Sequence, residues 1–274
     1  MNTERLMQIA LDLAGLRDVP GDSAIHHAGK GIRRVLIGID LRSSELALAK
    51  TLGYDAVIAH HPVGGTATLG FHAVLGRHAD QMEAAGVPRE VARSILAEVS
   101  ESRRIQDSMS NYDHDPSIAR LLDMPYLNIH TPLDEVGRRR MAAVAEQVDA
   151  EATVGDLVAA LYDGFGEFRH AATRIESLVG SMAHRLGRVV VSHAAGTNGG
   201  YPVAKAYFDH GVDTVLYIHC RPDEAGRLRH EVGATKTLVV TGHIASDSIG
   251  INPYIERLRG EGIEVTAASG ILAP

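Results

Sequence analysis

Residues 53–62 read Gly-Tyr-Asp-Ala-Val-Ile-Ala-His-His-Pro, a short apolar run that ends in two histidines and a proline. The run Asp55–Ala59 predicts a strand buried on both faces, because its apolar residues are continuous rather than alternating. Pro62 cannot donate a hydrogen bond to a neighbouring strand, so the strand must break there. Successive side chains of a regular strand point to opposite faces, so His60 and His61 can reach one site only at that break.

Apolar strands alternate with helical segments on both sides of this run. Further buried strands are predicted at residues 34–40, 126–130, 188–193, 212–219 and 237–241. Helices are predicted at residues 3–15, 43–53, most of 71–122, 138–149, 154–162, the stretch up to 209, 223–229 and 246–259. Residues 18–31 are expected to form a loop. This alternation is typical of α/β layers rather than of a helical bundle or a β-sandwich.

An internal similarity suggests a duplicated fold. Residues 53–61 can be aligned with residues 211–219, and each segment follows a helix and ends in histidine. We interpret them as parts of two related α/β lobes that face a central metal-binding cleft, within one domain spanning residues 1–274. The approximate lobes are 1–125 with 244–274, and 126–243. The alternative is chance, since helix, glycine and strand recur in this order in every α/β unit.

The composition narrows the class of protein. With 274 residues, of which 45% are hydrophobic, the chain can bury a sizeable core. A net charge of -7 argues against nucleic acid as the main partner. No apolar run has the length of a secretory core or a membrane span, so a cytoplasmic protein is expected. Cys220 is the single cysteine, which excludes an internal disulfide and a thiolate metal cluster.

The 15 histidines are an enrichment, since ordinary usage would give roughly six or seven. Either imidazole chemistry or a general compositional bias of the host explains them. Three elements place histidine or aspartate at the end of a predicted strand or the start of a helix, where ligands bind in open α/β sheets. They are His60-His61-Pro62, His130-Thr131-Pro132-Leu133-Asp134, and Gly242-His243-Ile244-Ala245-Ser246-Asp247.

Each element also has a structural explanation. His60 and His61 could be a buried pair with its own hydrogen bonds, and Asp134 could cap the following helix. Ser246 or Asp247 could likewise cap the last helix, although the spacing of His243 and Asp247 puts both on one helical face. We expect His130 to be packed beside the site, or to support a ligand, rather than to be a ligand itself.

Together the three elements offer three imidazoles, from His60, His61 and His243, and two carboxylates, from Asp134 and Asp247. Nitrogen and oxygen donors without thiolate suit Zn, Fe, Mn or Co better than Ca or Mg. A bridging carboxylate would hold two divalent ions about 3.5 to 4 Å apart, a spacing that generates hydroxide near neutral pH.

These residues, in this order, resemble the NIF-three-like family, whose members are known as GTP cyclohydrolase 1 type 2 homologues. The resemblance rests on Asp40 at a strand end and on the three elements above, and it runs over nearly the whole chain. It implies a two-lobed α/β subunit, a dinuclear metal centre in the cleft and a toroidal homohexamer. The family's metal ligands correspond to His60, His61, Asp134, His243 and Asp247.

The chain departs from the family pattern in three places. Asp247 stands where the family usually has glutamate, which is one methylene longer. The segment 72–122 is longer and more helical than the family leads us to expect. No additional domain of about a hundred residues separates the two lobes.

Two functional hypotheses follow. In the first, the chain is a metal-dependent hydrolase of a small, nucleotide-like substrate, and the resemblance suggests ring opening of GTP. His193 and His219 are its candidate proton-transfer residues, and residues 196–200 form either a phosphate cradle or a simple turn. In the second, the chain is a metal-binding scaffold or regulatory protein that serves protein partners and turns over no substrate.

Overall fold

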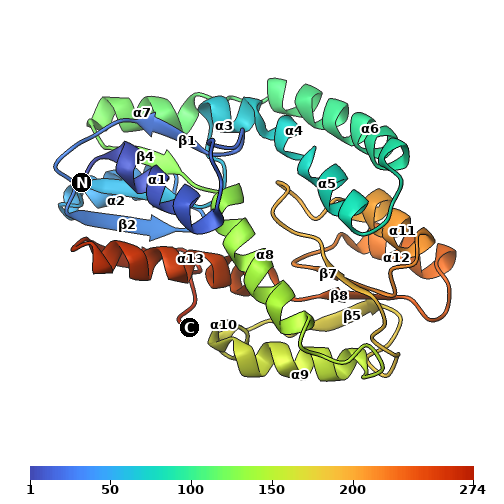
Figure 1. The fold of residues 1–274 in the computed structure, drawn as a ribbon. Coiled ribbons are helices and arrows are strands. Elements are labelled where there is room, and N and C mark those ends of the chain that lie inside the picture. The colour runs from blue at the N-terminus through green and yellow to red at the C-terminus, as the bar shows by residue number, and fades with distance from the viewer. The chain divides into compact units, whose positions relative to one another are not determined.

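The computed structural model describes residues 1–274, which form 13 helices and nine strands (Figure 1). The chain divides into two compact units. The first unit consists of Met1–Val74, Glu101–Val136 and Gly250–Ile271, and the second of Leu75–Ser100, Gly137–Ile249 and Leu272–Pro274. None of the helices combines the length and the apolar character that crossing a membrane requires.

The first unit contains a five-stranded sheet in the order β1-β4-β3-β2-β9. All neighbouring strands run parallel except β1, which is antiparallel to β4 at one edge. The bounds of the strands, in chain order, are β1 Ala24–His27, β2 Arg34–Gly38, β3 Ala56–Ala59, β4 Tyr126–Asn128 and β9 Glu264–Ala268. The predicted strands in this unit are therefore confirmed, each slightly shorter than expected.

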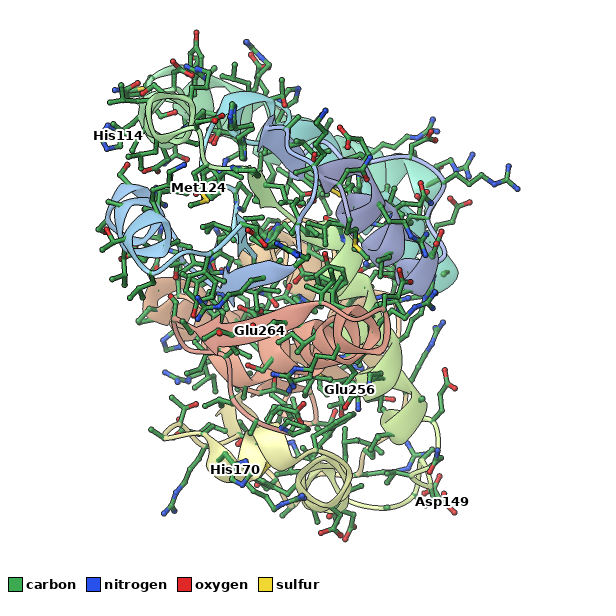
Figure 2. All side chains as sticks on the ribbon, turned by 90° about the vertical axis from the view of Figure 1, so that its left-hand side faces the viewer. His114, Met124, Asp149, His170, Glu256 and Glu264 are labelled. Carbon is green, nitrogen blue, oxygen red and sulfur yellow. The ribbon has the colours of Figure 1, made fainter.

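Helices cover both faces of this sheet. Alternate side chains of β2 separate the faces, since Val35 and Ile37 join one apolar cluster and Leu36 joins the other. The first cluster includes α1 (Thr3–Ala14) and the later turns of α13 (His243–Gly260). The second includes α2 (Ser43–Thr51) and α7 (His114–Leu122). In Figure 2 the labels His114 and Met124 mark the beginning of α7 and the buried residue just beyond its end.

Four further helices belong wholly or partly to the first unit. They are α3 (Gly65–Leu69), α4 (Phe71–Val74), α6 (Arg89–Ser108), which begins in the second unit and ends in the first, and α8 (Thr131–Ala145), which begins in the first unit and ends in the second. With α5 (Arg77–Ala84) and α7, the helices α4 and α6 confirm that the segment 71–122 is mostly helical.

The second unit contains a four-stranded sheet in the order β5-β8-β7-β6. β6, β7 and β8 are parallel, and β5 is antiparallel to β8 at the edge. The bounds of the strands are β5 Glu176–Val179, β6 Val189–Val191, β7 Thr214–Tyr217 and β8 Thr237–Val240.

Helices also cover both faces of the second sheet. One apolar cluster joins the sheet to α5, the first turns of α6, α11 (Gly200–Asp209) and α12 (Pro222–Glu231). The other joins it to the later turns of α8 (Thr131–Ala145), α9 (Val154–Gly164) and the short α10 (Gly166–His170). Each unit is therefore a three-layer α/β sandwich built around its own core.

The predicted duplication appears in the topology. In each unit the chain first forms an antiparallel edge strand and then three parallel strands, and the edge strand pairs with the last of the three. The order β1-β4-β3-β2 thus matches β5-β8-β7-β6, and β9 is an addition to the first sheet. The two related α/β lobes that the sequence predicted are present as these two units.

The observed units divide the chain differently from the expected lobes. Residues 126–136 lie in the first unit because β4 pairs with β3 and β1. Residues 75–100 lie in the second because Met82 and Leu96 pack into its core. The expected loop at 18–31 was wrong in part, since it contains β1, and α8 begins at Thr131 rather than near residue 138.

Candidate metal centre

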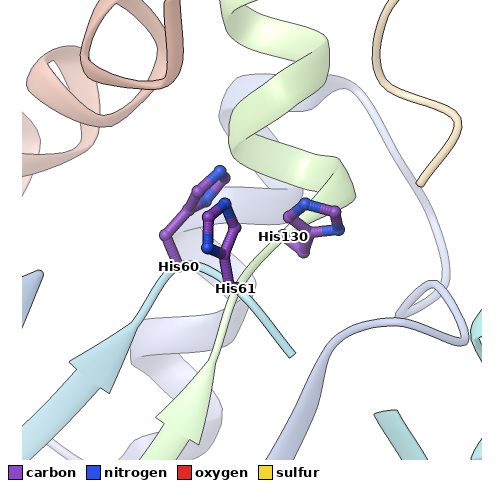
Figure 3. A group of neighbouring side chains, drawn as sticks. All are labelled: His60, His61 and His130. Carbon is purple, nitrogen blue, oxygen red and sulfur yellow. The ribbon is translucent and has the colours of Figure 1, made fainter. Parts of the chain in front are cut away.

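His60 and His61 lie just beyond the last residue of β3, where the strand has already ended. The backbone N–H groups of both residues donate to the carbonyl of Ile39. The chain then turns through Gly64 and Gly65, both at positive φ. The two imidazole rings lie on the same side of the break, with centroids 5.2 Å apart (Figure 3). The prediction that the pair converges where the strand breaks is confirmed.

Each of these two rings is held through its Nδ1 atom. Nδ1 of His60 is 3.0 Å from the carbonyl oxygen of Ile129, and Nδ1 of His61 is 2.9 Å from Oδ1 of Asp40. Since a carbonyl or carboxylate oxygen only accepts, Nδ1 must carry the proton in both rings. Nε2 is then the atom that each ring can offer to a metal ion, which is the usual arrangement in metal sites.

His130 lies in the same group, two residues after β4. Its ring centroid is 5.0 Å from that of His60 and 5.6 Å from that of His61 (Figure 3). One ligand atom from each of these three side chains lies within 4.8 Å of those of the other two. Three imidazoles of the first unit therefore form a cluster that could hold a metal ion.

Asp22 orients His130. This fully buried carboxylate lies 2.8 Å from Nδ1 of His130 and accepts a hydrogen bond of 2.7 Å from the Thr131 hydroxyl. Burial lowers the pKa of His130, but the carboxylates of Asp134 and Asp22 outweigh it and raise that pKa above the ordinary value. Asp22 was not predicted as a site residue, because it lies in the segment expected to be a loop.

Asp134 completes the cluster from the first turn of α8. Its Oδ1 is 3.1 Å from Nε2 of His60, and its Oδ2 is 3.6 Å from Nε2 of His130. The helix begins at Thr131, so Asp134 lies inside it and does not occupy the capping position ahead of it. A buried carboxylate between two imidazoles suits a metal ligand.

The second unit contributes a smaller group at the start of α13. Nε2 of His243 is 3.4 Å from Oδ2 of Asp247, one helical turn further on. The helix begins at His243, so neither Ser246 nor Asp247 caps it. The Ser246 hydroxyl instead donates to the carbonyl of Gly242. The prediction that His243 and Asp247 share one helical face is confirmed.

The two predicted proton-transfer residues lie in different surroundings within the second unit. The ring of His219 is 4.6 Å from that of His243, and the side-chain amide of Asn198 lies 3.3 Å from its Nε2. His193 neighbours His78 of α5, and burial lowers the pKa of His78 to about 4. His219 is thus beside a proposed ligand, while His193 belongs to a buried pair of imidazoles.

The loop at 196–200 fits a turn better than a phosphate cradle. The α11 helix begins at Gly200, and the Glu224 carboxylate lies directly against that glycine. A carboxylate at a helix N-terminus already compensates its positive partial charge, so an added anion would be repelled. Within the loop, the Thr197 hydroxyl accepts the N–H of Gly199.

Comparisons with solved structures find chains that are similar over nearly the whole length of this protein. A NIF3 superfamily protein from Sphaerobacter thermophilus is 50% identical, covers 98% of each chain and has a TM-score of 0.94. Reduced HcgD from Methanocaldococcus jannaschii is 12% identical over 97% of each chain, with a TM-score of 0.56. A Bacillus cereus protein related to NIF3 is 12% identical, covers 100% of this chain and 97% of its own, and has a TM-score of 0.51. The last two show a similar fold alone.

The search against family models finds no match, and no curated protein matches.

Proposed function

The chain belongs to the NIF3 superfamily, and we propose that it is a dinuclear metal protein that hydrolyses a small, nucleotide-like substrate. Its proposed ligands are His60, His61 and Asp134 of the first unit, and His243 and Asp247 of the second. The ions are two divalent cations of the Zn, Fe, Mn or Co group, because every donor is an imidazole or a carboxylate.

The observation that carries this proposal is the fixing of Nδ1 in His60 and His61. The carbonyl of Ile129 and the carboxylate of Asp40 hold the two rings in one orientation and in one tautomer. A pair of histidines that served packing alone would need no such common orientation. The carboxylate of Asp134 lies 3.1 Å from Nε2 of His60, where a shared ion would sit next to both.

Paired divalent ions supply Lewis-acid chemistry and lower the pKa of bound water to about 7. The residues of the chain do the rest. Asp40 fixes the ring of His61, and Asp134 presents two oxygens to the site. In this proposal His219 holds or moves a proton beside His243, and His193 is the second candidate for that role. Ring opening of GTP is the specific reaction that the family resemblance suggests.

Metal analysis followed by a turnover screen tests the proposal. Purified full-length protein should hold two divalent ions per chain and should hydrolyse at least one compound among GTP, other nucleotides and phosphoesters. His61→Ala should lose both the activity and at least one ion. His114→Ala is the matched control, since this histidine of the same unit has a side chain 63% exposed and should change neither.

The outcomes separate the hypotheses. If the wild-type protein holds two ions but hydrolyses none of the compounds, and His61→Ala is equally inactive, the metal-binding scaffold is favoured. Protein that takes up no divalent ion would contradict the proposed function altogether.

Assembly and location complete the proposal. A homohexamer in the cytoplasm is what the family resemblance and the composition led us to expect. Light scattering coupled to size exclusion should give a mass of about six chains, and a monomeric mass would contradict the assembly.

A further inference from the structure

We propose that the first unit holds one of the two ions by itself, with His130 as a third imidazole ligand beside His60, His61 and Asp134. This inference rests on the proposed function, and it adds a ligand and an order of affinity. The tighter ion belongs to the first unit, and its binding needs neither His243 nor Asp247.

The spacing of the three rings supports a common ion. Their centroids are 5.2, 5.0 and 5.6 Å apart. A metal–nitrogen bond of about 2.0 to 2.1 Å places each ring centroid roughly 3.2 Å from the ion, so ligands in tetrahedral directions have centroids about 5 Å apart. The centroids of the three rings are therefore about as far apart as in a tetrahedral site, and one ligand atom from each ring lies within 4.8 Å of the other two. The carboxylate of Asp134, beside His60 and His130, is positioned as the fourth ligand.

His130 is also held more firmly than packing alone requires. Asp22 binds its Nδ1, and the hydroxyl of Ser23 accepts its backbone N–H. The ring of Phe71 stacks against its imidazole at 6.0 Å, and the guanidinium of Arg103 lies 3.7 Å from the centre of the Phe71 ring. Such support on several sides fixes a ligand before the metal arrives, which raises affinity.

The second unit cannot build the same ligand set. The position two residues beyond β8, which corresponds to His130 beyond β4, is Gly242. Its φ is +103°, a conformation that side chains rarely adopt, and an added Cβ would lie 2.8 Å from Oγ1 of Thr173. The second unit therefore offers Asp247 and the neighbouring imidazoles of His219 and His243, but no imidazole at the place of His130, which is why its ion should be the weaker one.

Cobalt titration of the full-length chain tests this inference, because Co²⁺ reports its ligands through visible absorption without any turnover. Wild type should bind two equivalents. His243→Ala should keep one tight equivalent with the spectrum of the tighter wild-type site. His130→Ala and His130→Gln should weaken that tight site at least 100-fold. His114→Ala is the control and should titrate like wild type.

Several results would overturn the inference. His130 variants that titrate like wild type would remove it from the ligand set, and loss of both equivalents from His243→Ala would show that the first unit cannot hold an ion alone. Thermal unfolding of each variant without metal shows whether the fold persists, and His130→Gln, which keeps a polar side chain, guards against simple misfolding. Failure of wild type to bind cobalt would overturn the proposed function as well, so the two failures are distinguishable.

Discussion

The two units share one strand order, yet their strand ends carry different side chains. Beyond β3 the first unit has His60 and His61, whereas the same positions beyond β7 in the second unit are Ile218 and His219. In the second unit, His219 lies beyond the end of β7 and its ring neighbours that of His243, at the start of α13. The repeated topology thus fixes where a site can form, and the side chains at those positions decide what the site can bind.

The two units also differ in their buried histidines, and this difference should have the largest effect, which is on the pH dependence of stability. His130 in the first unit is buried beside two carboxylates, which raise its pKa. His78 in the second unit is buried near His193 and Arg77, and burial, with a smaller contribution from these two groups, lowers its pKa from 6.5 to about 4. Between pH 6.5 and pH 4 the unfolded chain therefore binds a proton at His78, whereas the folded chain does not.

The free energy of unfolding should therefore fall as the pH falls from 6.5 towards 4, by up to about 3 kcal/mol from His78. In His78→Gln the free energy of unfolding should fall less steeply over this range than in wild type. Urea unfolding at pH 7 and pH 4.5 measures the difference, with His114→Gln as a control. Equal slopes in wild type and His78→Gln would contradict the account of this residue.

The next largest expected effect is on the affinity for the ions, and it comes from the residues that orient the imidazoles. Asp22 supports His130 in the first unit, and Thr173 stands beside Gly242 at the matching place in the second. Asp22→Asn should lower the affinity of the tighter ion by about 10- to 100-fold, whereas Thr173→Ala should leave it unchanged. Competition with a chelator measures both affinities. Equal losses in the two variants would mean that the units are not as different as their strand ends suggest.

Asp40 should have the smallest effect of the three. Its carboxylate binds Nδ1 of His61 as Asp22 binds that of His130, but its side chain is 57% exposed, so water can take over part of its role. Asp40→Asn should weaken ion binding by only about 10-fold, near the lower end of such effects. The same chelator competition, with Asp113→Asn as an exposed control in this unit, checks the expectation. A loss larger than that of Asp22→Asn would reverse the ranking.

The sequence predicted those parts of the fold that local pattern determines. Continuous apolar runs predicted β2, β3, β7 and β8, because a strand that is buried on both faces is apolar along nearly its whole length. The edge strand β1, Ala24–His27, was missed because it is short and half polar. The added strand β9 was missed as well, since its burial alternates weakly and its pairing with β2 joins residues more than 200 positions apart.

The same limit applies to the site. His60 with His61, and His243 with Asp247, were predicted because each pair is local and its spacing states its geometry. The role of Asp22 depends on a contact with His130 across 108 residues, which no local pattern encodes. His130 was expected to support the site, and its place among the other two rings became visible only with their distances.

Anomalous diffraction from crystals of the full-length chain grown with Zn²⁺ or Co²⁺ would show whether the proposed ligands hold two ions. We expect two strong metal peaks per chain, one of them within bonding distance of His60, His61 or Asp134 and the other next to His243. Crystals without metal at these side chains, or with ions bound only at exposed histidines such as His114, would rule out the dinuclear centre.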